Sequence, residues 1–358
     1  MRVFVTGAAG LIGGEVTRRL VANGHRVTAL VHRNPEIRGN DGKAVADHAA
    51  IRGDLTLTKL GWSDGEHEAV ACDHELIIHC AATTRFDLSD AQYRAVNVEG
   101  TARIIELARA GGAALLHVGT AYVCGMRDGP VGEDDPPPET GFANGYEASK
   151  AAGEALITHS GVPYAIVRPS IVVGEHATGV IRQFDAIYAA FKLIATGRVR
   201  HMAAHPDATL DFVPLDHVAA GIVAVADQIT EADGGRFHLV SGQPVPVQAF
   251  AAAIGAYQHF KAPTLVQPER FDAAALPPGK RRLYLRVAGL YSSYFQRAPL
   301  FGDRRFRALT GLACPPTDAA YLKRLIDYAI ARGFLPKDES STPSPPRDRA
   351  TPLPLPAA

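Results

Sequence analysis

The chain has 358 residues, of which 47% are hydrophobic and 21% are charged, and its 37 basic side chains balance 37 acidic ones. A neutral chain lacks the basic footprint of a nucleic-acid-binding protein, and no apolar run approaches the roughly 18 residues that cross a bilayer. The four cysteines are scattered and form no C-x-x-C pair, which argues against a disulfide framework or structural metal and fits a reducing compartment. Because the first expected strand begins at Arg2, we expect no signal peptide and a cytoplasmic location.

Strands and helical segments alternate along the first half of the chain. Short apolar runs predict strands at 2–7, 25–33, 50–54, 75–82, 114–123 and 164–170. Helical segments are expected between them, at 11–24, at 89–110 and from 145 onward. Several strands are apolar throughout, which is typical of parallel strands buried on both faces. The alternation therefore predicts an α/β fold with a Rossmann-type doubly wound parallel sheet.

After about residue 175 the pattern changes. We expect a long helix over 180–197, two strand-then-helix units over 208–227 and 235–257, and mostly helical structure over 268–335. Ligands of such sheets bind outside the carboxyl ends of the strands, so this smaller, mostly helical C-terminal part is interpreted as a substrate-binding cap. The predicted domains are a dinucleotide-binding core (1–175), a substrate-binding region partly interleaved with the core (176–336) and a disordered Pro-rich tail (337–358).

A glycine-rich loop, "TGAAGLIGG", connects the first strand to the first helix. Glycine permits a tight turn and close approach of the backbone to a diphosphate, and the helix that follows presents free N–H groups to the anion. The spacing is G-x-x-G-x-x-G, and the alternative is an ordinary strand–helix turn. Its place at the first turn of an alternating pattern favours nucleotide binding. The predicted cofactor contacts in this loop are Thr6, Gly7, Gly10, Leu11, Ile12 and Gly13.

The end of the second strand indicates which dinucleotide binds. NAD sites usually carry an acidic residue there to hold the ribose 2′-hydroxyl, whereas this chain reads "ALVHRNPE". Arg33, with His32 beside it, stands where a 2′-phosphate could bind, so NADPH is favoured and NAD(H) is the alternative. Arg33 could also be a solvated surface charge. In "RGDL", Asp54 is a candidate acceptor for the adenine amino group or a plain turn residue, and Leu55 is placed beside it.

Tyr146 and Lys150 lie four residues apart where a helix begins, in "GYEASKAAGE". Side chains at this spacing share a helix face, and most such pairs only pack their stems together. The chemical alternative is that the ammonium favours the phenolate and so lowers the pKa of Tyr146. His79 and His117 lie in apolar strands and are interpreted as buried structural histidines, because no third ligand stands at metal spacing. We therefore expect no metal site.

Taken in order, "TGAAGLIG", "GDL", "HCAATT", "NVEGT", "HVGTAYVCG", "GYEASK" and "VRPSIVVG" resemble the extended short-chain dehydrogenase/reductases over residues 1–335. The resemblance implies an NAD(P)-dependent oxidoreductase in which Tyr146 is the acid/base, Lys150 lowers its pKa and contacts the nicotinamide ribose, and Thr120 holds the substrate oxygen. The substrate carbonyl would accept two hydrogen bonds, which stabilise the oxyanion as hydride arrives. The other implied cofactor contacts are Ala81, Ala82 and Thr83 after the fourth strand, Asn97 beneath the site, and Pro169 and Ser170 near the nicotinamide.

A finer resemblance is carried by "AATTRFD", "TAYV" and "VPLDHVA". These stretches are similar to the fatty-acyl-CoA reductases and to the thioester reductase domains of peptide and polyketide assembly lines. The similarity implies NADPH-dependent reduction of an acyl thioester, held by CoA or by a carrier protein, to an aldehyde or an alcohol. The chain departs from this group in the Ala-Ala pair of its glycine loop and in residues 176–335, which match only loosely. The acyl group and its thiol carrier are left open by these departures.

Three other functions fit parts of the sequence. A ketone or aldehyde reductase, or a hydroxyl dehydrogenase, needs only the same three side chains. A nucleotide-sugar epimerase tends to have an acidic residue where Arg33 stands, and the Asp-Glu pair of sugar dehydratases is replaced by Ala121 and Tyr122. A non-catalytic NADP-binding sensor usually loses the tyrosine or the lysine. The stretch 277–295 joins a basic cluster to an aromatic one, and is either a cap helix or a surface for the carrier's phosphates or a membrane; a homodimer is left open.

Overall fold

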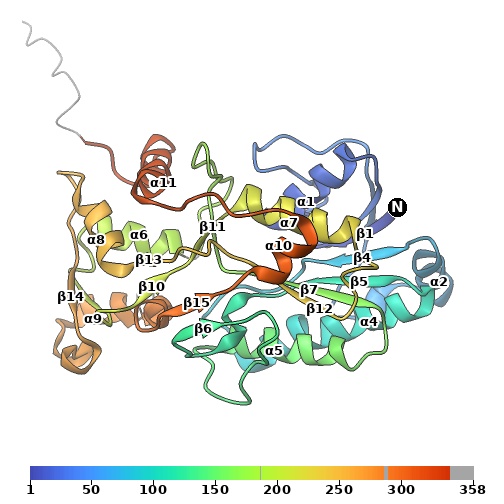
Figure 1. Cartoon of the computed structure of the whole chain (residues 1–358), viewed down its shortest axis with the longest axis horizontal. Helices are drawn as coiled ribbons and strands as arrows, with labels where there is room; N and C mark the ends of the chain where they lie inside the picture. Colours follow the sequence, from blue (N-terminus) through green and yellow to red (C-terminus); the bar gives the residue numbers. More distant parts are fainter. Residues whose placement is uncertain (186, 286–288, 339–358) are drawn as a thin grey trace, which may run out of the picture.

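The computed structural model describes residues 1–185, 187–285 and 289–338 (Figure 1). Its centre is a seven-stranded sheet in the order β3-β2-β1-β4-β5-β7-β12, in which every neighbouring pair is parallel. The strands are β1 (Arg2–Thr6), β2 (Arg26–Val31), β3 (Ala49–Arg52), β4 (Leu76–His79), β5 (Ala114–Val118), β7 (Tyr164–Pro169) and β12 (Gly235–Leu239). This topology confirms the predicted Rossmann-type sheet. The predicted tail, beyond residue 338, lies outside the described residues.

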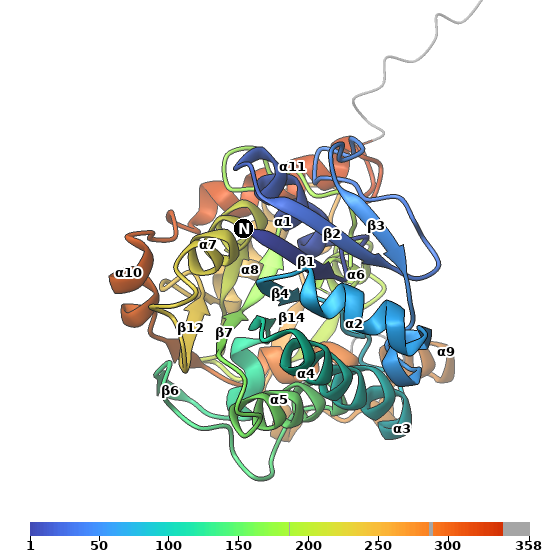
Figure 2. The same ribbon diagram turned by 90° about the vertical axis from the view of Figure 1, so that its right-hand side faces the viewer.

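Helices cover both faces of the sheet (Figure 2). One face carries α1 (Leu11–Ala22) and α7 (Leu215–Asp227), and the other carries α2 (Asp64–Cys72), α4 (Glu99–Gly111) and α5 (Gly145–Thr158). Successive strand residues point to opposite faces. In β1, Val3 and Val5 belong to the apolar cluster formed with α1 and α7, and Phe4 belongs to the cluster formed with α4. Both faces are therefore buried, which explains why the strands are apolar throughout.

The helix expected over 89–110 forms as three consecutive segments. A capping box between Ser89 and Gln92 begins α3 (Asp90–Tyr93), a π-helical turn, η2 (Arg94–Val98), follows, and α4 continues to Gly111. π-helical turns inside α-helices occur frequently at functional sites. This one contains Asn97, whose side chain is buried.

The remaining elements build a smaller unit beside the carboxyl ends of the sheet strands (Figure 1). Its helices, with α10 against the sheet, are α6 (Ile187–Ala195), α8 (Val247–Gly255), α9 (Pro278–Leu283), α10 (Arg304–Thr310) and α11 (Ala319–Ala331). Its strands pair as β8 (Ile171–Val173) with β11 (Phe212–Pro214), β10 (Thr209–Leu210) with β13 (Val245–Pro246), β9 (His201–Ala203) with β14 (Thr264–Val266), and β6 (Gly129–Val131) with β15 (Pro299–Phe301). Short 3-10 helices are η3 (Ala121–Cys124), η4 (Pro268–Arg270), η5 (Ala273–Ala275) and η7 (Gly289–Phe295), and η1 (Thr58–Gly61) packs against α2 and α4.

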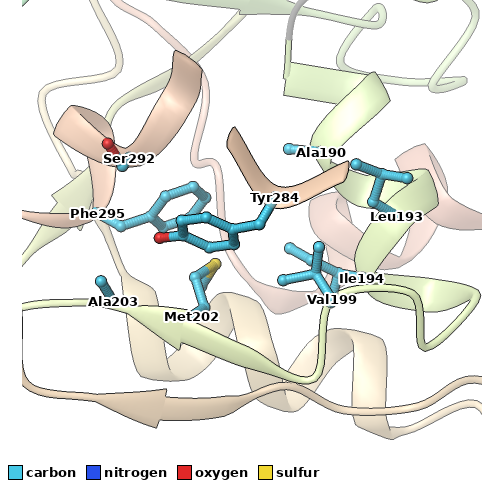
Figure 3. A pocket seen from close by; sticks show the side chains of 9 residues that line it. All are labelled: Ala190, Leu193, Ile194, Val199, Met202, Ala203, Tyr284, Ser292 and Phe295. Atoms are coloured by element: carbon cyan, nitrogen blue, oxygen red, sulfur yellow. The ribbon is translucent and has the colours of Figure 1, made fainter. Parts of the chain in front are cut away.

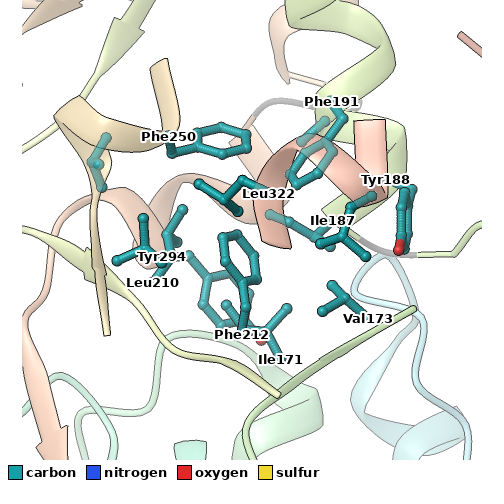
Figure 4. Packing of buried hydrophobic residues seen from close by; sticks show 14 of the residues in the cluster. Ile171, Val173, Ile187, Tyr188, Phe191, Leu210, Phe212, Phe250, Tyr294 and Leu322 are labelled. Carbon is teal, nitrogen blue, oxygen red and sulfur yellow. The ribbon is translucent and has the colours of Figure 1, made fainter. Parts of the chain in front are cut away.

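This smaller unit, the cap, has an apolar core of its own (Figure 4). The rings of Phe191 in α6 and Phe250 in α8 lie 4.6 Å apart, and Phe212 of β11 packs edge-on against Phe191. Ile171 and Val173 of β8 join the same cluster directly after β7 of the central sheet. Buried apolar surface stabilises by about 25 cal/mol per Å², so this shared core fixes the cap at the strand ends.

The first cap helix differs from expectation. α6 begins at Ile187, and residues 180–185 are not helical. Their backbone groups bond elsewhere, because Val180 O accepts a hydrogen bond from Asn40 Nδ2 at 3.0 Å and Arg182 N donates to Asn40 Oδ1 at 2.9 Å. The helix expected over 180–197 is thus corrected to 187–195. No helix among the described residues is both long and apolar enough to span a membrane.

Candidate active site

The glycine-rich loop has a geometry that only glycine allows. Gly7 has φ +70°, and a Cβ there would lie 2.7 Å from Ala81 N; a Cβ on Gly13 would lie 2.3 Å from Gly7 O. Real Cβ atoms do not approach backbone so closely, and positive φ favours glycine. Thr6 Oγ1 accepts a hydrogen bond from Ala81 N at 3.2 Å, which ties this loop to the segment after β4. The cradle that results fits a dinucleotide diphosphate at the start of α1.

A groove of about 580 Å³ runs along this loop across the ends of β1, β2 and β4. It brings together eight of the seventeen predicted cofactor contacts, namely Gly7, Gly10, His32, Arg33, Asp54, Leu55, Ala81 and Ala82. Leu11 and Ile12 lie at the start of α1 and pack against the apolar cores of the cap and the sheet respectively. The groove is also lined by residues that we did not predict from the sequence, including Asn34, Thr56, Cys80 and Val96.

At its far end the groove meets a second hollow, of about 640 Å³, with three basic side chains. His32 and Arg33 follow β2, and Arg52 stands beside them because β2 and β3 pair with Val31 opposite Arg52. Asp54 Oδ2 lies 3.2 Å from His32 Nε2, and its Oδ1 accepts hydrogen bonds from Thr56. Burial raises the pKa of Asp54, but the Thr56 hydrogen bonds and the neighbouring positive charges bring it below its usual value. Arg52 was missed from the sequence.

Thr120 and Tyr146 meet at the carboxyl end of β5. Thr120 follows this strand and begins η3, with 5% of its surface exposed. Tyr146 lies in the first turn of α5, which the Asn144 side chain caps by accepting a hydrogen bond from Glu147 N. Burial raises the pKa of Tyr146 above its usual value, and the hydrogen bond with Thr120 acts in the opposite direction. A protonated phenol and a hydroxyl thus stand side by side.

Lys150 lies one turn further along α5 and is 2% exposed. Its Nζ donates to Val118 O at 2.7 Å and to His117 Nε2 at 3.1 Å, so the ammonium points at β5. Burial lowers the pKa of Lys150 to about 8. In this structure the contacts of Lys150 are with β5, and burial dominates the pKa of the phenol. That Lys150 lowers the pKa of Tyr146 stays a prediction.

The two strand histidines form a buried pair behind Lys150. Their rings lie 5.3 Å apart, and His79 is held by Thr6 Oγ1 at 2.7 Å and Thr101 Oγ1 at 3.2 Å. Burial, with the nearby ammonium of Lys150, lowers the pKa of His79 to about 3, so this ring is neutral at pH 7. Within the part of the chain that the structure describes, no group of three acidic, histidine or cysteine side chains is arranged to hold a metal ion.

Asn97 joins the segment after β4 to α5. Its Oδ1 accepts from Thr83 N at 2.8 Å, and its Nδ2 donates to Thr83 O at 3.1 Å and to Ser149 Oγ at 2.9 Å. On the other side of the site, Pro169 O accepts a hydrogen bond from Thr120 Oγ1 at 3.4 Å, and Ser170 Oγ donates to buried Asp211. Of the predicted residues, Pro169 therefore contacts Thr120 directly, Thr83 and Asn97 are joined to α5 through Ser149, and Ser170 bonds to Asp211.

Aromatic side chains flank Tyr146 on the cap side. The ring of Phe86 lies 5.5 Å from Tyr146 and 5.3 Å from Tyr291, and Tyr294 packs edge-on against Tyr122 at 4.7 Å. Beside this aromatic wall is an apolar pocket lined by α6, β9 and η7 (Figure 3). Its lining residues are Ala190, Leu193, Ile194, Val199, Met202, Ala203, Tyr284, Ser292 and Phe295. In the sequence, only the aromatic residues of 284–295 indicated the aromatic wall and the pocket.

The sequence profile of a family described as male sterility protein matches residues 5–222, which is more than half of the chain. The chain belongs to this family. Among solved structures, the terminal R domain from the myxalamid PKS-NRPS biosynthetic pathway superposes with a TM-score of 0.81 and 25% identity, over 94% of this chain and 92% of that one. These findings confirm the resemblance to the thioester-reductase group of extended short-chain dehydrogenase/reductases and the expected class of NAD(P)-dependent oxidoreductase.

Two known reductases are also similar to this member of the male sterility protein family. The 4-hydroxy-2-methyl-3-oxo-4-farnesyl-3,4-dihydroquinoline-1-oxide ketoreductase of Stigmatella aurantiaca is 30% identical over 274 residues, covering 73% of this chain and 75% of that protein. Aldehyde reductase lnaA of Aspergillus flavus is 27% identical over 269 residues, covering 67% of this chain and 25% of that protein. The chain spans only 6% of the length of the hybrid PKS-NRPS synthetases that it also matches.

Proposed function

We propose that this chain reduces an acyl thioester, held by CoA or by a carrier protein, to an aldehyde with NADPH, with further reduction to an alcohol as a second cycle. The observation that carries the proposal is the pair of hydroxyls, Thr120 and Tyr146, placed together at the strand ends beside the glycine-rich loop. The similarity to a terminal R domain supports the thioester as the substrate class.

The chain's own residues would act on the substrate oxygen. NADPH, when bound in the groove, supplies the hydride that adds to the thioester carbonyl. Thr120 and Tyr146 then stabilise the oxyanion by two hydrogen bonds, and Tyr146, kept protonated by burial, donates the proton. The hemithioacetal expels the thiol, so one thioester, one NADPH and one proton give one aldehyde, one thiol and NADP⁺. Lys150 fixes α5 against β5 through Val118 O.

Two features of the cap support an acyl substrate on a phosphate-bearing arm. The apolar pocket, of about 10 Å³, has an apolar lining but would have to open to admit a hydrocarbon chain, and its Phe295 directly follows Tyr294 of the aromatic wall. Tyr284, which also lines it, follows the exposed basic helix α9 with Lys280, Arg281 and Arg282. Positive side chains beside an apolar pocket suit a thioester whose thiol arm carries phosphates. The partner proposed is accordingly CoA or a phosphopantetheine-bearing carrier protein.

A second candidate function is the reduction of a ketone or aldehyde. The ketoreductase of Stigmatella aurantiaca is similar along three quarters of its length. The same two hydroxyls suffice for this reaction, and the aromatic wall at Phe86 and Tyr291 suits a flat carbonyl substrate.

Cofactor oxidation distinguishes the two candidates. Purified protein would be mixed with NADPH and either a panel of acyl-CoA thioesters or a matched panel of ketones and aldehydes, and absorbance followed with time. We expect NADPH consumption with a thioester and release of free thiol in equal amount. Consumption with carbonyl compounds alone would overturn thioester reduction in favour of the second candidate.

Arg33 gives a prediction about cofactor choice. We expect Arg33→Ala to raise the Kd of NADPH by about tenfold to a hundredfold, because one charge-assisted hydrogen bond to the 2′-phosphate is lost. The Kd of NADH should stay nearly unchanged. Fluorescence titration with both dinucleotides measures this. Arg26→Ala, an exposed arginine at the opposite end of β2, is the matched control. Equal weakening of both dinucleotides would contradict the 2′-phosphate site.

A further inference from the structure

Arg182 follows the core in sequence but lies on the glycine-rich loop. Its Nη2 donates to Gly10 O at 2.9 Å and to Ala9 O at 3.5 Å. Ala9 and Gly10 also line the dinucleotide groove, and α1 begins at the next residue, Leu11. A guanidinium from the segment that leads into α6 thus stands at the turn where the cradle fits a diphosphate.

The charge of Arg182 is not balanced by an acidic partner. In residues 1–185, 187–285 and 289–338, no carboxylate lies within ion-pair distance of its guanidinium, and its Nε is buried without a hydrogen-bond partner. Neighbouring arginines do have acidic partners, since Arg18 and Arg19 pair with Glu15 and Arg38 pairs with Glu36. Burial, followed by the charge of Arg38, lowers the pKa of Arg182 below its usual value. A half-buried, unpaired cation is costly, and an anion beside it would offset that cost.

Asn40 holds the segment that carries Arg182. Asn40 is 2% exposed, and its own N–H donates to Glu15 Oε2 at 3.1 Å. Its Nδ2 donates to Val180 O and Glu175 Oε1, and its Oδ1 accepts from Arg182 N. Because Asn40 holds both Val180 O and the N–H of Arg182, the Arg182 side chain reaches the glycine loop from a segment that is already fixed to the core.

We propose that Arg182 binds the diphosphate of the dinucleotide, together with the free N–H groups at the start of α1. An arginine offers several donors to phosphate oxygens, and such charge-assisted bonds are about twice as strong as neutral ones. Bound diphosphate would then join the cap to the core, since residues 175–182 also contact Asn40. The inference rests on the proposed function only in that a dinucleotide binds at the glycine loop, and it is independent of the substrate.

The test is a set of binding titrations with Arg182→Gln. The diphosphate is common to both dinucleotides, so we expect the Kd of NADPH and the Kd of NADH to rise by the same factor, at least about tenfold. The Kd of 2′-AMP, which has no diphosphate, should change less than about twofold. Arg182→Lys keeps the charge and should recover part of the affinity. Arg38→Gln, a nearby arginine already paired with Glu36, should leave all three constants unchanged.

Two results would overturn the proposal. An unchanged Kd for both dinucleotides would show that Arg182 only supports the loop. An equal rise for 2′-AMP, or the same effect in Arg38→Gln, would show a general loss of structure or of positive field. Melting temperatures of the variants, measured beside the titrations, identify a loss of folding. Failure of the thioester assay would leave these titrations unaffected, so the two proposals can fail separately.

Discussion

Tyr146→Phe is expected to lower kcat by about 10²- to 10⁴-fold, the usual contribution of a positioned acid, and to leave the Kd of NADPH unchanged. The phenol lies beside Thr120, where it can donate a proton to the substrate oxygen, and burial raises its pKa so that it stays protonated through neutral pH. Phenylalanine keeps the ring and its packing on Phe86 at 5.5 Å. The measurement is a steady-state assay on whichever substrate panel is turned over, with a parallel NADPH titration.

The control for this substitution is Tyr164→Phe. Tyr164 begins β7 and therefore lies at the amino end of the sheet, away from Thr120 and Tyr146. The same loss of a hydroxyl there should leave kcat within about twofold. If Tyr146→Phe kept most of its turnover, the acid would have to be another group. If it lost NADPH binding instead, Tyr146 would be part of the cofactor site.

The fold and the cofactor loop could be predicted because their signals are local. Each sheet strand is a short apolar run, and Gly7, Gly10 and Gly13 stand within one turn. The meeting of Thr120 with Tyr146 was implied by the resemblance to the extended short-chain dehydrogenase/reductases, whose motifs the chain carries in order. The structure gives the positions and contacts of these residues, and their catalytic roles stay a prediction.

The parts that escaped prediction depend on contacts between distant residues. Apolar spacing over 180–197 fits a helix, but Asn40, some 140 residues earlier, takes up the backbone groups of Val180 and Arg182. The direction of the Lys150 ammonium depends on β5, which lies 32 residues before it. Helical spacing alone places Lys150 near Tyr146 and gives no information about which strand the ammonium contacts. The helix predicted over 180–197 was wrong for a physical reason, because a local pattern does not show which distant residue bonds to a backbone group.

A buried ion pair between the cap and the catalytic helix gives the second large effect. Arg297 Nη2 lies 2.6 Å from Glu147 Oε1, and the two side chains are 1% and 0% exposed. Arg297 Nη1 also donates to Gly125 O at 2.7 Å, and its guanidinium stacks over the ring of Tyr122. Glu147 directly follows Tyr146, so this pair connects the segment between η7 and β15 to the first turn of α5.

Arg297→Met is expected to lower the free energy of unfolding by about 3–5 kcal/mol, because it leaves the carboxylate of Glu147 buried without its cation. Lys323→Met, which breaks the exposed pair of Lys323 and Asp327 in α11, is the matched control and should cost less than about 1 kcal/mol. Denaturant titration of the two variants beside the unaltered chain measures both values. Equal costs would mean that the Arg297 pair is hydrated in solution.

The double variant Glu147→Leu with Arg297→Met separates the pair's own attraction from the cost of an orphaned charge. Taking two charges out of water is expensive, so a buried pair replaced by apolar groups often loses little stability. We therefore expect the double variant to recover most of the stability that Arg297→Met loses, although the bond to Gly125 O is still missing. Additive losses would instead show that each side chain stabilises through its other contacts. Turnover should stay low in the recovered protein, because the segment between η7 and β15 is then no longer held by charge against the turn that carries Tyr146.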